Sequence, residues 1–367
     1  MKLNHLHMVN FRNYASASFS PGSDKNVIIG ENGQGKTNLL EAISVVALGK
    51  SFKTHSLKEA IRFGQEASYL KADFFLKDYD HRMEIEFSET GRSYQRDQNP
   101  RKSLADYKRG FSMVVFQPED LDMVRLSPGK RRAFLNDALS SVSFSYEENL
   151  KNYRHLVRQR NYALKNLRSD RQLIKIYNLQ LAKIGSEILY ERLKGIKKLA
   201  SWAREEYQKI SNGGEDLKVH YLSSLPFDQD FQVQSEIYLQ KLEESYEKDL
   251  VQKRTSLGPH VDDLRFLLDG REAKAYGSQG QQRSIVLSLK LAEVRFIWER
   301  LGIRPLVILD DVFSELDQHR RKRLFKQIEG MQTFISLTEA DYHLRDLLEE
   351  EDLSSFEIRG NQINHVS

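Results

Sequence analysis

An eight-residue glycine-rich segment, GENGQGKT, contains the residue types that bind a phosphate chain. It follows the pattern G-x-x-x-x-G-K-[ST], with an apolar run at residues 27–29 before it and an amphipathic stretch after it. Glycines let backbone amides approach phosphate oxygens, and the start of the next helix adds partial positive charge. A chance glycine-rich turn is the alternative, which the flanking strand and helix disfavour. The predicted ATP-binding residues here are Gly30, Glu31, Asn32, Gly33, Gln34, Gly35, Lys36 and Thr37.

Two neighbouring aspartates complete the predicted catalytic site. They follow the apolar run 306–309, which is typical of a strand buried in a parallel sheet, and such strands deliver side chains to the ligand-binding edge. We expect Lys36 to contact the β- and γ-phosphates, and Thr37 and Asp310 to hold Mg²⁺. Asp311 would orient or deprotonate the attacking water. Alone, the two aspartates could simply cap a strand end, but beside the glycine-rich segment the catalytic interpretation is stronger.

The segment YGSQGQQR, followed by a predicted helix over 284–299, resembles the signature of ABC-type ATPases. A serine hydroxyl, a close-approach glycine and free amides at a helix start would form a second anion site. In that class this helix belongs to one subunit and contacts the γ-phosphate held by another, so ATP should join two copies. An ordinary Ser/Gly helix cap is the alternative. The predicted ATP-binding residues of this segment are Ser278, Gly280 and Gln281.

Three further positions have roles that the same class suggests. Gln117 follows an apolar run at 113–116 and could sense Mg²⁺ and water as a catalytic residue, while a simple turn residue before Pro118 is an equal alternative. Residues 314–317 follow the predicted strand 306–309, where the class carries a loop that links opposed active sites. The class also has a switch histidine after the next strand, but residues 336–338 are Ser-Leu-Thr, which predicts slow turnover.

The predicted site residues can be brought together only if α/β segments form at both ends of the chain. Alternating or apolar runs predict strands at 69–76, 83–87, 113–116, 306–309 and 333–336, and a helix follows the glycine-rich segment. The middle, from residue 128 to about 212, has helical spacing and suggests an antiparallel helix pair joined near 168–170. A strand at 219–222 and a helix at 235–249 come next. The predicted fold class is α/β, an ABC-type P-loop ATPase head split by a mostly helical insert domain.

The predicted domains follow from this order of elements. Residues 1–118 form the N-terminal part of the head, residues 119–253 the helical insert or arm, and residues 254–367 the C-terminal part of the head. The chain has no cysteine, which excludes disulfides and thiolate metal sites. It also lacks an apolar stretch of roughly 18–20 residues and a recognisable signal peptide. We therefore expect a cytoplasmic protein without a membrane partner.

A formal net charge of +4 permits a polyanionic partner without requiring one. Lysines and arginines occur along the predicted helix pair, interleaved with Tyr153 and Tyr162. Contacts between these side chains and backbone phosphates would give sequence-tolerant, salt-sensitive DNA binding. A merely solvated helix face is the alternative, because several glutamates dilute the charge. The candidate DNA-binding residues are Lys130, Arg131, Arg132, Arg154, Arg158 and Lys165; the wider basic stretch also includes Lys151, Arg160, Arg168 and Arg171.

Taken together, these segments resemble the RecF family of bacterial recombination-repair ATPases, which is related to SMC proteins. The resembling stretches are NFRNY at 10–14, FQPEDL at 116–121, SPGKRRAFL at 127–135, SLGPHVDD at 256–263, and the segments 278–293 and 309–317. The first of them adds Arg12 to the predicted ATP-binding residues. Gln117 stands where many members have a small residue, and Val261 where an arginine is expected.

The resemblance implies an ATP-dependent homodimer that binds single-stranded and gapped duplex DNA. It further implies cooperation with RecR and RecO in loading RecA, roles in replication and the SOS response, and slow DNA-stimulated ATP hydrolysis used as a switch. Two other functions stay open. One is an ABC transporter ATPase subunit, which the long helical insert disfavours; the other is a non-catalytic ATP-gated DNA clamp.

Overall fold

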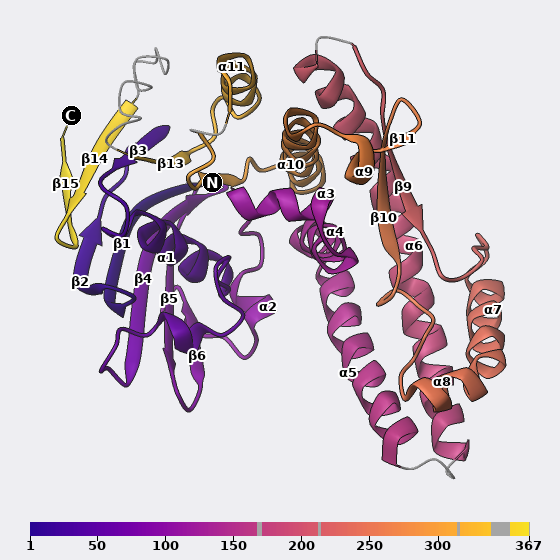
Figure 1. Cartoon of the computed structure of the whole chain (residues 1–367). Helices are drawn as coiled ribbons and strands as arrows, with labels where there is room; N and C mark the ends of the chain where they lie inside the picture. Colours follow the sequence, from indigo (N-terminus) through magenta and orange to yellow (C-terminus); the bar gives the residue numbers. More distant parts are fainter. Residues whose placement is uncertain (167–170, 212–213, 314–315, 339–352, 367) are drawn as a thin grey trace. The chain divides into compact units, whose positions relative to one another are not determined.

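The computed structural model describes residues 1–166, 171–211, 214–313, 316–338 and 353–366 (Figure 1). The chain forms two compact units, one built from Met1–Asp120 with Glu293–Ser367 and the other from Leu121–Ala292. The first is called the head unit here and the second the arm unit. This division into units does not test the domain boundaries predicted at 118/119 and 253/254, which stay a prediction. Helix α10 (Gln279–Leu301) begins in the arm unit and ends in the head unit.

The head unit contains an antiparallel sheet that comes mostly from the N-terminal hundred residues. Its strand order is β2-β1-β4-β5-β6-β7. Fully buried and less buried side chains alternate along β4, as expected for a strand with one face on the core. This confirms the predicted strands at 69–76 and 83–87. The strands are β1 (Lys2–Phe11), β2 (Tyr14–Phe19), β4 (Ala67–Leu76), β5 (Tyr79–Ser88), β6 (Arg92–Arg96) and β7 (Asn99–Pro100).

A second sheet of the head unit is mainly parallel and joins segments from both ends of the chain. Its order is β15-β14-β3-β13-β12-β8, and β14, β3, β13, β12 and β8 run parallel. The strands β3, β13 and β12 are buried along their whole length, which explains why their sequences are mostly apolar. The strands are β3 (Lys25–Ile29), β8 (Met113–Phe116), β12 (Leu306–Leu309), β13 (Thr333–Leu337), β14 (Leu353–Arg359) and β15 (Gln362–His365).

Helix α1 (Lys36–Leu48) shares one hydrophobic core with strands of both head sheets. Nearly all of its residues are buried, so its apolar sequence reflects packing on more than one side. This packing fixes the direction of the helix start, where the glycine-rich loop ends. The head unit also contains the short helices η1 (Leu57–Ala60), α2 (Leu104–Tyr107) and α11 (Gln318–Gln327), and η2 (Pro118–Leu121) begins in it.

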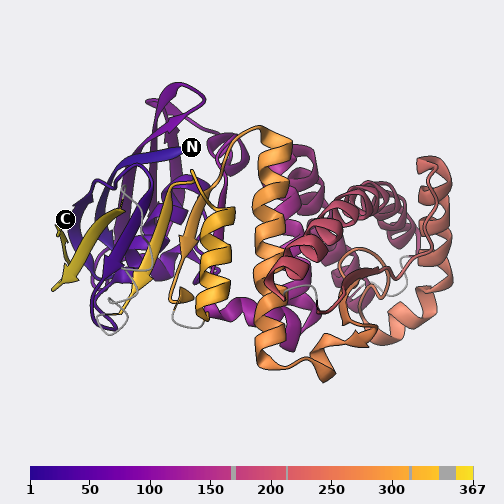
Figure 2. The same ribbon diagram turned by 90° about the horizontal axis from the view of Figure 1, so that it is seen from above.

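The arm unit is mostly helical, as predicted. Its two long helices, α5 (Phe144–Asn166) and α6 (Arg171–Ile210), lie side by side in both views (Figures 1 and 2). The predicted connection at 168–170 lies outside the described residues. A three-stranded sheet of order β11-β10-β9 accompanies the helices, and its strand β9 confirms the strand predicted at 219–222. Its strands are β9 (Leu217–Leu222), β10 (Asp263–Leu268) and β11 (Arg271–Glu272).

The single helix predicted over 235–249 is wrong. The chain forms α7 (Phe231–Glu244) and α8 (Tyr246–Gln252), with Ser245 between them. After this break Tyr246 packs on the core with Ala163 and Leu164, and the carboxylate of Asp249 pairs with a buried arginine. The remaining helices of the unit are α3 (Asp122–Arg125), α4 (Pro128–Val142) and α9 (Ala273–Tyr276).

Two arginines of the arm unit are almost fully buried and connect distant segments. Arg160 donates to Asn178, to Asp249 at 2.7 Å and to Thr255 at 2.8 Å. Arg192 donates to the backbone oxygen of Pro259 and to Asn136. Since buried charges are tolerated only when they are paired and hydrogen-bonded, these side chains serve the fold. Arg160, which belongs to the basic stretch, is therefore not a surface cation.

Candidate nucleotide-binding site

The glycine-rich loop connects the end of β3 to the start of α1 in the head unit. Gly35, the residue before the helix, has φ of 115°, a conformation that L side chains rarely adopt. A Cβ atom there would lie 2.6 Å from Nδ2 of Asn13 and 2.9 Å from Oη of Tyr14. The glycine is therefore required by both the backbone conformation and the close approach of the β1–β2 turn.

Lys36 is buried at the first position of α1 and its side chain turns back over the loop. Its ammonium group donates to the backbone oxygens of Gly30, at 2.7 Å, and of Glu31, at 3.0 Å. A positive charge thus lies inside the loop, beside the helix N-terminus with its partial positive charge. This arrangement is suited to a polyphosphate, and the phosphate contact of Lys36 stays a prediction.

Thr37 and Asp310 meet although they are far apart in the sequence. The hydroxyl of Thr37 donates to Oδ1 of Asp310 at 3.0 Å. The sheet order explains the meeting. Asp310 follows β12, and only β13 lies between β12 and β3 in the parallel sheet. Burial, followed by the negative charge of Asp311, raises the pKa of Asp310 to about 6. The hydroxyl and carboxylate oxygens are ligands that Mg²⁺ prefers, so the pair fits the predicted metal role.

Ser336, at the end region of β13, contacts this same carboxylate. Its hydroxyl lies 2.9 Å from Oδ1 of Asp310, and its side chain is buried. The sequence drew attention to residues 336–338 only because they contain no histidine. The signal that could have revealed Ser336 is a hydroxyl residue near the end of a mostly apolar strand beside β12.

Gln117 lies at the edge of the sheet where Asp310 also lies. Phe116 pairs with Leu309, and the backbone amide of Asp310 donates to the oxygen of Phe116 at 2.9 Å. The amide of Gln117 donates to the carboxylate of Asp120, and the amide of Asp120 donates back to the Gln117 oxygen. Gln117 is thus both near the aspartates and part of a turn, which leaves its catalytic role a prediction.

Arg12 is held by a carboxylate that the sequence analysis missed. Its guanidinium forms two hydrogen bonds to Glu41, at 2.8 and 2.7 Å, and a third to the backbone oxygen of Glu59. Glu41 is fully buried on α1 and also accepts from Ser51. A lone acid in the apolar stretch LLEAISVV was the available signal. The predicted contact of Arg12 with ATP stays a prediction.

The signature segment begins α10 in the arm unit. Ser278 and Gln281 form reciprocal hydrogen bonds, since Ser278 Oγ accepts from the Gln281 amide at 3.2 Å and Gln281 Oε1 accepts from the Ser278 amide at 2.6 Å. This is a capping box, so the helix-cap interpretation describes a real feature. Ser278 is nevertheless exposed, and Gly280 lies in the first turn. The role of these residues toward a second copy stays a prediction.

The candidate DNA-binding residues do not all lie on the surface. Arg154, Arg158 and Lys165 are exposed, and their spacing puts them on one face of α5. Lys130, at the start of α4, is exposed as well, whereas Arg132 is half-buried and donates to the backbone oxygen of Asp262. The prediction that Arg131 binds DNA is wrong, because its side chain is buried and two nitrogens of its guanidinium donate to the carboxylate of Asp263. Arg131 leaves the candidate set.

Residues 2–346 match the family model described as the RecF/RecN/SMC N-terminal domain. The DNA replication and repair protein RecF of Enterococcus faecalis is 39% identical over 356 residues, which cover 95% of each chain. The chain belongs to the RecF family.

Solved structures agree with this family membership. A structure of the recombination mediator protein RecF with ATP, from the RecFOR pathway, aligns with a TM-score of 0.90 at 31% identity and covers 100% of this chain and 99% of its own. The Smc head domain of Pyrococcus furiosus aligns with a TM-score of 0.55 at 14% identity, which shows a shared fold alone. The predicted fold class is confirmed. Among the described residues, no helix combines the length and the apolar character that crossing a membrane requires.

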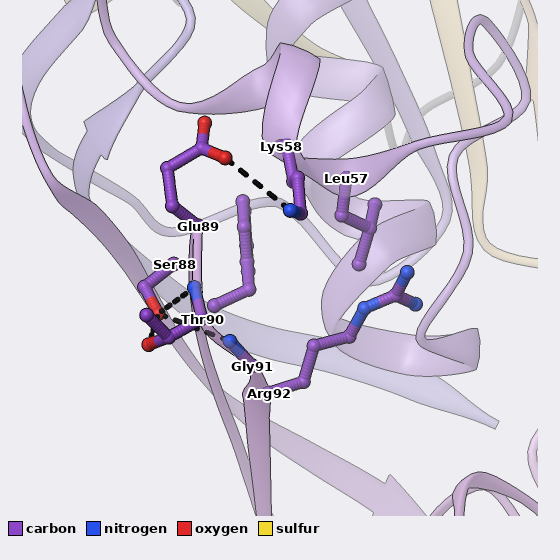
Figure 3. A pocket seen from close by; sticks show the side chains of 8 residues that line it. Leu57, Lys58, Ser88, Glu89, Thr90, Gly91 and Arg92 are labelled. Atoms are coloured by element: carbon purple, nitrogen blue, oxygen red, sulfur yellow. Dashed lines mark hydrogen bonds and ion pairs between the residues drawn. The ribbon is translucent and has the colours of Figure 1, made fainter.

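An open pocket of about 150 Å³ lies elsewhere in the head unit, at the β5–β6 turn (Figure 3). Lys58 pairs with Glu89 at its rim, and Ser88 accepts from the amides of Thr90 and Gly91. None of the predicted phosphate or metal ligands lines it. The pocket is therefore no part of the candidate site. Its lining residues are Leu57, Lys58, Phe87, Ser88, Glu89, Thr90, Gly91 and Arg92.

Proposed function

We propose that this chain is an ATP-dependent DNA-binding protein of recombinational repair, in which ATP acts as a switch. The observation that carries the proposal is the meeting of Lys36, Thr37 and Asp310 at one sheet edge of a RecF-family head. The curated relatives are named for DNA replication and repair, and a solved relative binds ATP. We extend both the repair role and ATP binding to this chain.

The head residues would divide the nucleotide chemistry among them. Lys36 and the amides at the start of α1 bind the phosphate oxygens, and Thr37 and Asp310 would hold Mg²⁺. When bound, Mg²⁺ supplies positive charge to the phosphate oxygens. Asp311 would orient the attacking water or accept its proton, and Gln117, which follows the strand beside β12, would assist. Hydrolysis resets the switch.

Dimerisation would complete the nucleotide site. Ser278, Gly280 and Gln281 of one copy contact the triphosphate that is bound to the glycine-rich loop of the other. The exposure of Ser278 at the start of a 23-residue helix supports this role, because such a helix start can accept an external anion. ATP would thereby join two copies, and its hydrolysis would release them.

The arm unit would supply a DNA contact through the exposed face of α5. Arg154, Arg158 and Lys165 would bind backbone phosphates of single-stranded or gapped duplex DNA. Because the solved relative is named in the RecFOR pathway, we extend the partnership with RecR and RecO, and the loading of RecA, to this chain as part of the proposal. The protein would act in the cytoplasm.

The deciding experiment measures molecular mass by light scattering, with and without ATP and Mg²⁺. The parent protein should double its mass with ATP. Lys36→Ala should lose ATP affinity by roughly 10- to 100-fold and dimerisation with it, since it removes a charged hydrogen-bond donor. Ser278→Arg should bind ATP as one copy but fail to dimerise.

The matched control is Gln232→Arg, which adds the same charge at an exposed position on α7. It should dimerise like the parent. Dimerisation of Ser278→Arg at the parent's ATP concentration would refute the shared site, and a parent protein that binds no ATP would refute the proposed function as a whole.

A further inference from the structure

The C-terminal β-hairpin contacts the glycine-rich loop. Its first strand, β14, lies parallel to β3, the strand that leads into the loop, and β15 returns antiparallel to β14. The turn between them has Gly360 at φ of 57° and Asn361 at φ of 66°. Two consecutive residues with positive φ are typical of the tight turns that match the twist of a hairpin. The turn places the Asn361 side chain against the loop.

Asn13 is the point at which three segments meet. Its Nδ2 donates to the backbone oxygen of Gln34 at 3.1 Å and also to Oδ1 of Asn361. Its Oδ1 accepts from Nδ2 of Asn38, on α1, at 2.8 Å. Both donors and the acceptor of this amide are thus engaged. They connect the β1–β2 turn, the loop and its helix, and the C-terminal hairpin.

Two more contacts hold the hairpin against the loop. The backbone amide of Gly360 donates to Oε1 of Gln34 at 3.2 Å. At the other end of the loop, a Cβ atom on Gly30 would lie 2.7 Å from the backbone oxygen of Ile358. The hairpin therefore lies against the loop at its first glycine and again at Gln34.

The hydrogen bond from Asn13 to the Gln34 oxygen fixes the orientation of the Gln34–Gly35 peptide group. In a trans peptide the carbonyl and the following amide point in opposite directions. The Gln34 oxygen points to Asn13, and the Gly35 oxygen accepts from Tyr14 Oη at 3.1 Å. The amides of Gly35 and Lys36 therefore point away from the β1–β2 turn. Successive amides that point the same way form a nest for an anion.

We propose that the C-terminal hairpin is part of the nucleotide site, with Asn13 and Asn361 as positioning residues for the phosphate-binding amides. Asn361 holds the Asn13 amide, and Asn13 holds the Gln34–Gly35 peptide in the orientation that turns the Gly35 amide toward a phosphate. The inference rests on the proposed ATP binding. It assigns no contact with the nucleotide base to either asparagine.

The test compares the affinities of the full-length protein for ATP and for inorganic tripolyphosphate, by calorimetry with Mg²⁺. The informative variant is Asn361→Gly, because glycine keeps the left-handed turn and removes only the side chain. The control is Gln362→Ala, the next residue, which is exposed. Asn361→Gly should weaken both ligands by roughly 3- to 10-fold, the effect of removing one hydrogen bond, at an unchanged melting temperature. Gln362→Ala should bind both like the parent.

Asn13→Ala supplies a second, independent readout. It should weaken both ligands more than Asn361→Gly does, and adding Asn361→Gly to Asn13→Ala should cause no further loss, because Asn361 acts through Asn13. Unchanged affinity of Asn361→Gly for tripolyphosphate, whether or not ATP binding falls, overturns the inference, as do additive losses in the double variant. If the parent protein itself binds neither ligand, the proposed function has failed instead.

Discussion

The backbone amide of Asp311 donates to the hydroxyl oxygen of Ser336 at 2.8 Å, across two neighbouring strands of the parallel sheet. Asp311 has φ of 52°, a left-handed conformation that is uncommon for residues other than glycine. Backbone strain of this kind persists only where the surroundings hold it. Since Ser336 also contacts the carboxylate of Asp310, one hydroxyl orients both aspartates of the proposed catalytic pair.

Replacing Ser336 by alanine should therefore slow ATP hydrolysis more than it weakens ATP binding. We expect a loss of roughly 10-fold in kcat with little change in Kd, because the Ser336 hydroxyl orients the aspartates and not the phosphates. Single-turnover hydrolysis and equilibrium binding measure the two effects separately. Ser355→Ala is the control, since Ser355 is also a buried serine of this sheet and its hydroxyl has no hydrogen-bond partner among the described residues. Equal hydrolysis rates for Ser336→Ala and the parent would remove Ser336 from the mechanism.

The buried carboxylate of Asp310 should lower the stability of the nucleotide-free protein. Its pKa is raised from 3.8 to about 6, so the folded state holds this proton more tightly than the unfolded state does. The destabilisation is absent well below pH 4, grows as the pH rises toward 6, and stays constant above it. Asp310→Asn should raise the free energy of unfolding at pH 8 by about 1–3 kcal/mol, and by much less at pH 4. Urea unfolding in EDTA at the two pH values measures this; an equal gain at both would contradict the explanation.

Glu215 should couple the arm helices to the signature segment. It accepts a hydrogen bond from Tyr207, on α6, at 2.5 Å, and another from Nε2 of Gln281, whose Oε1 caps Ser278. Removing the carboxylate frees Gln281, so Glu215→Ala should weaken ATP-dependent dimerisation by roughly 3- to 10-fold. ATP binding by a single copy should not change. Sedimentation at several protein concentrations measures the dimer, with the exposed Glu243→Ala as the control. Parent-like dimerisation of Glu215→Ala would mean that the contact is only structural.

The sequence predicted those parts of the site that depend on local pattern. The glycine-rich loop, the strands beside it and the aspartates after β12 each have a short signal, because loop, strand and helix follow one another directly. The contact between Asn13 and Asn361 has no such signal, since it joins residues 348 positions apart and depends on the strand order of the whole sheet. Similarly, Arg160 looks like its exposed neighbours in the sequence. Only packing reveals that Asp249 and Thr255 surround it.

The exposed and the buried arginines of α5 should respond differently to substitution. Replacing Arg154, Arg158 and Lys165 by alanine should flatten the salt dependence of DNA affinity, by about 0.7 units of slope for each phosphate of single-stranded DNA that is no longer neutralised. The melting temperature should change little, because all three side chains are exposed. Arg160→Ala should leave the salt slope unchanged and lower the melting temperature. It leaves Asp249 buried without its ion pair, which costs about 3–5 kcal/mol in stability. Fluorescence anisotropy at several salt concentrations decides the matter. If the triple variant keeps the parent slope, the exposed face of α5 does not bind DNA, and the DNA-binding surface must be sought elsewhere on the protein.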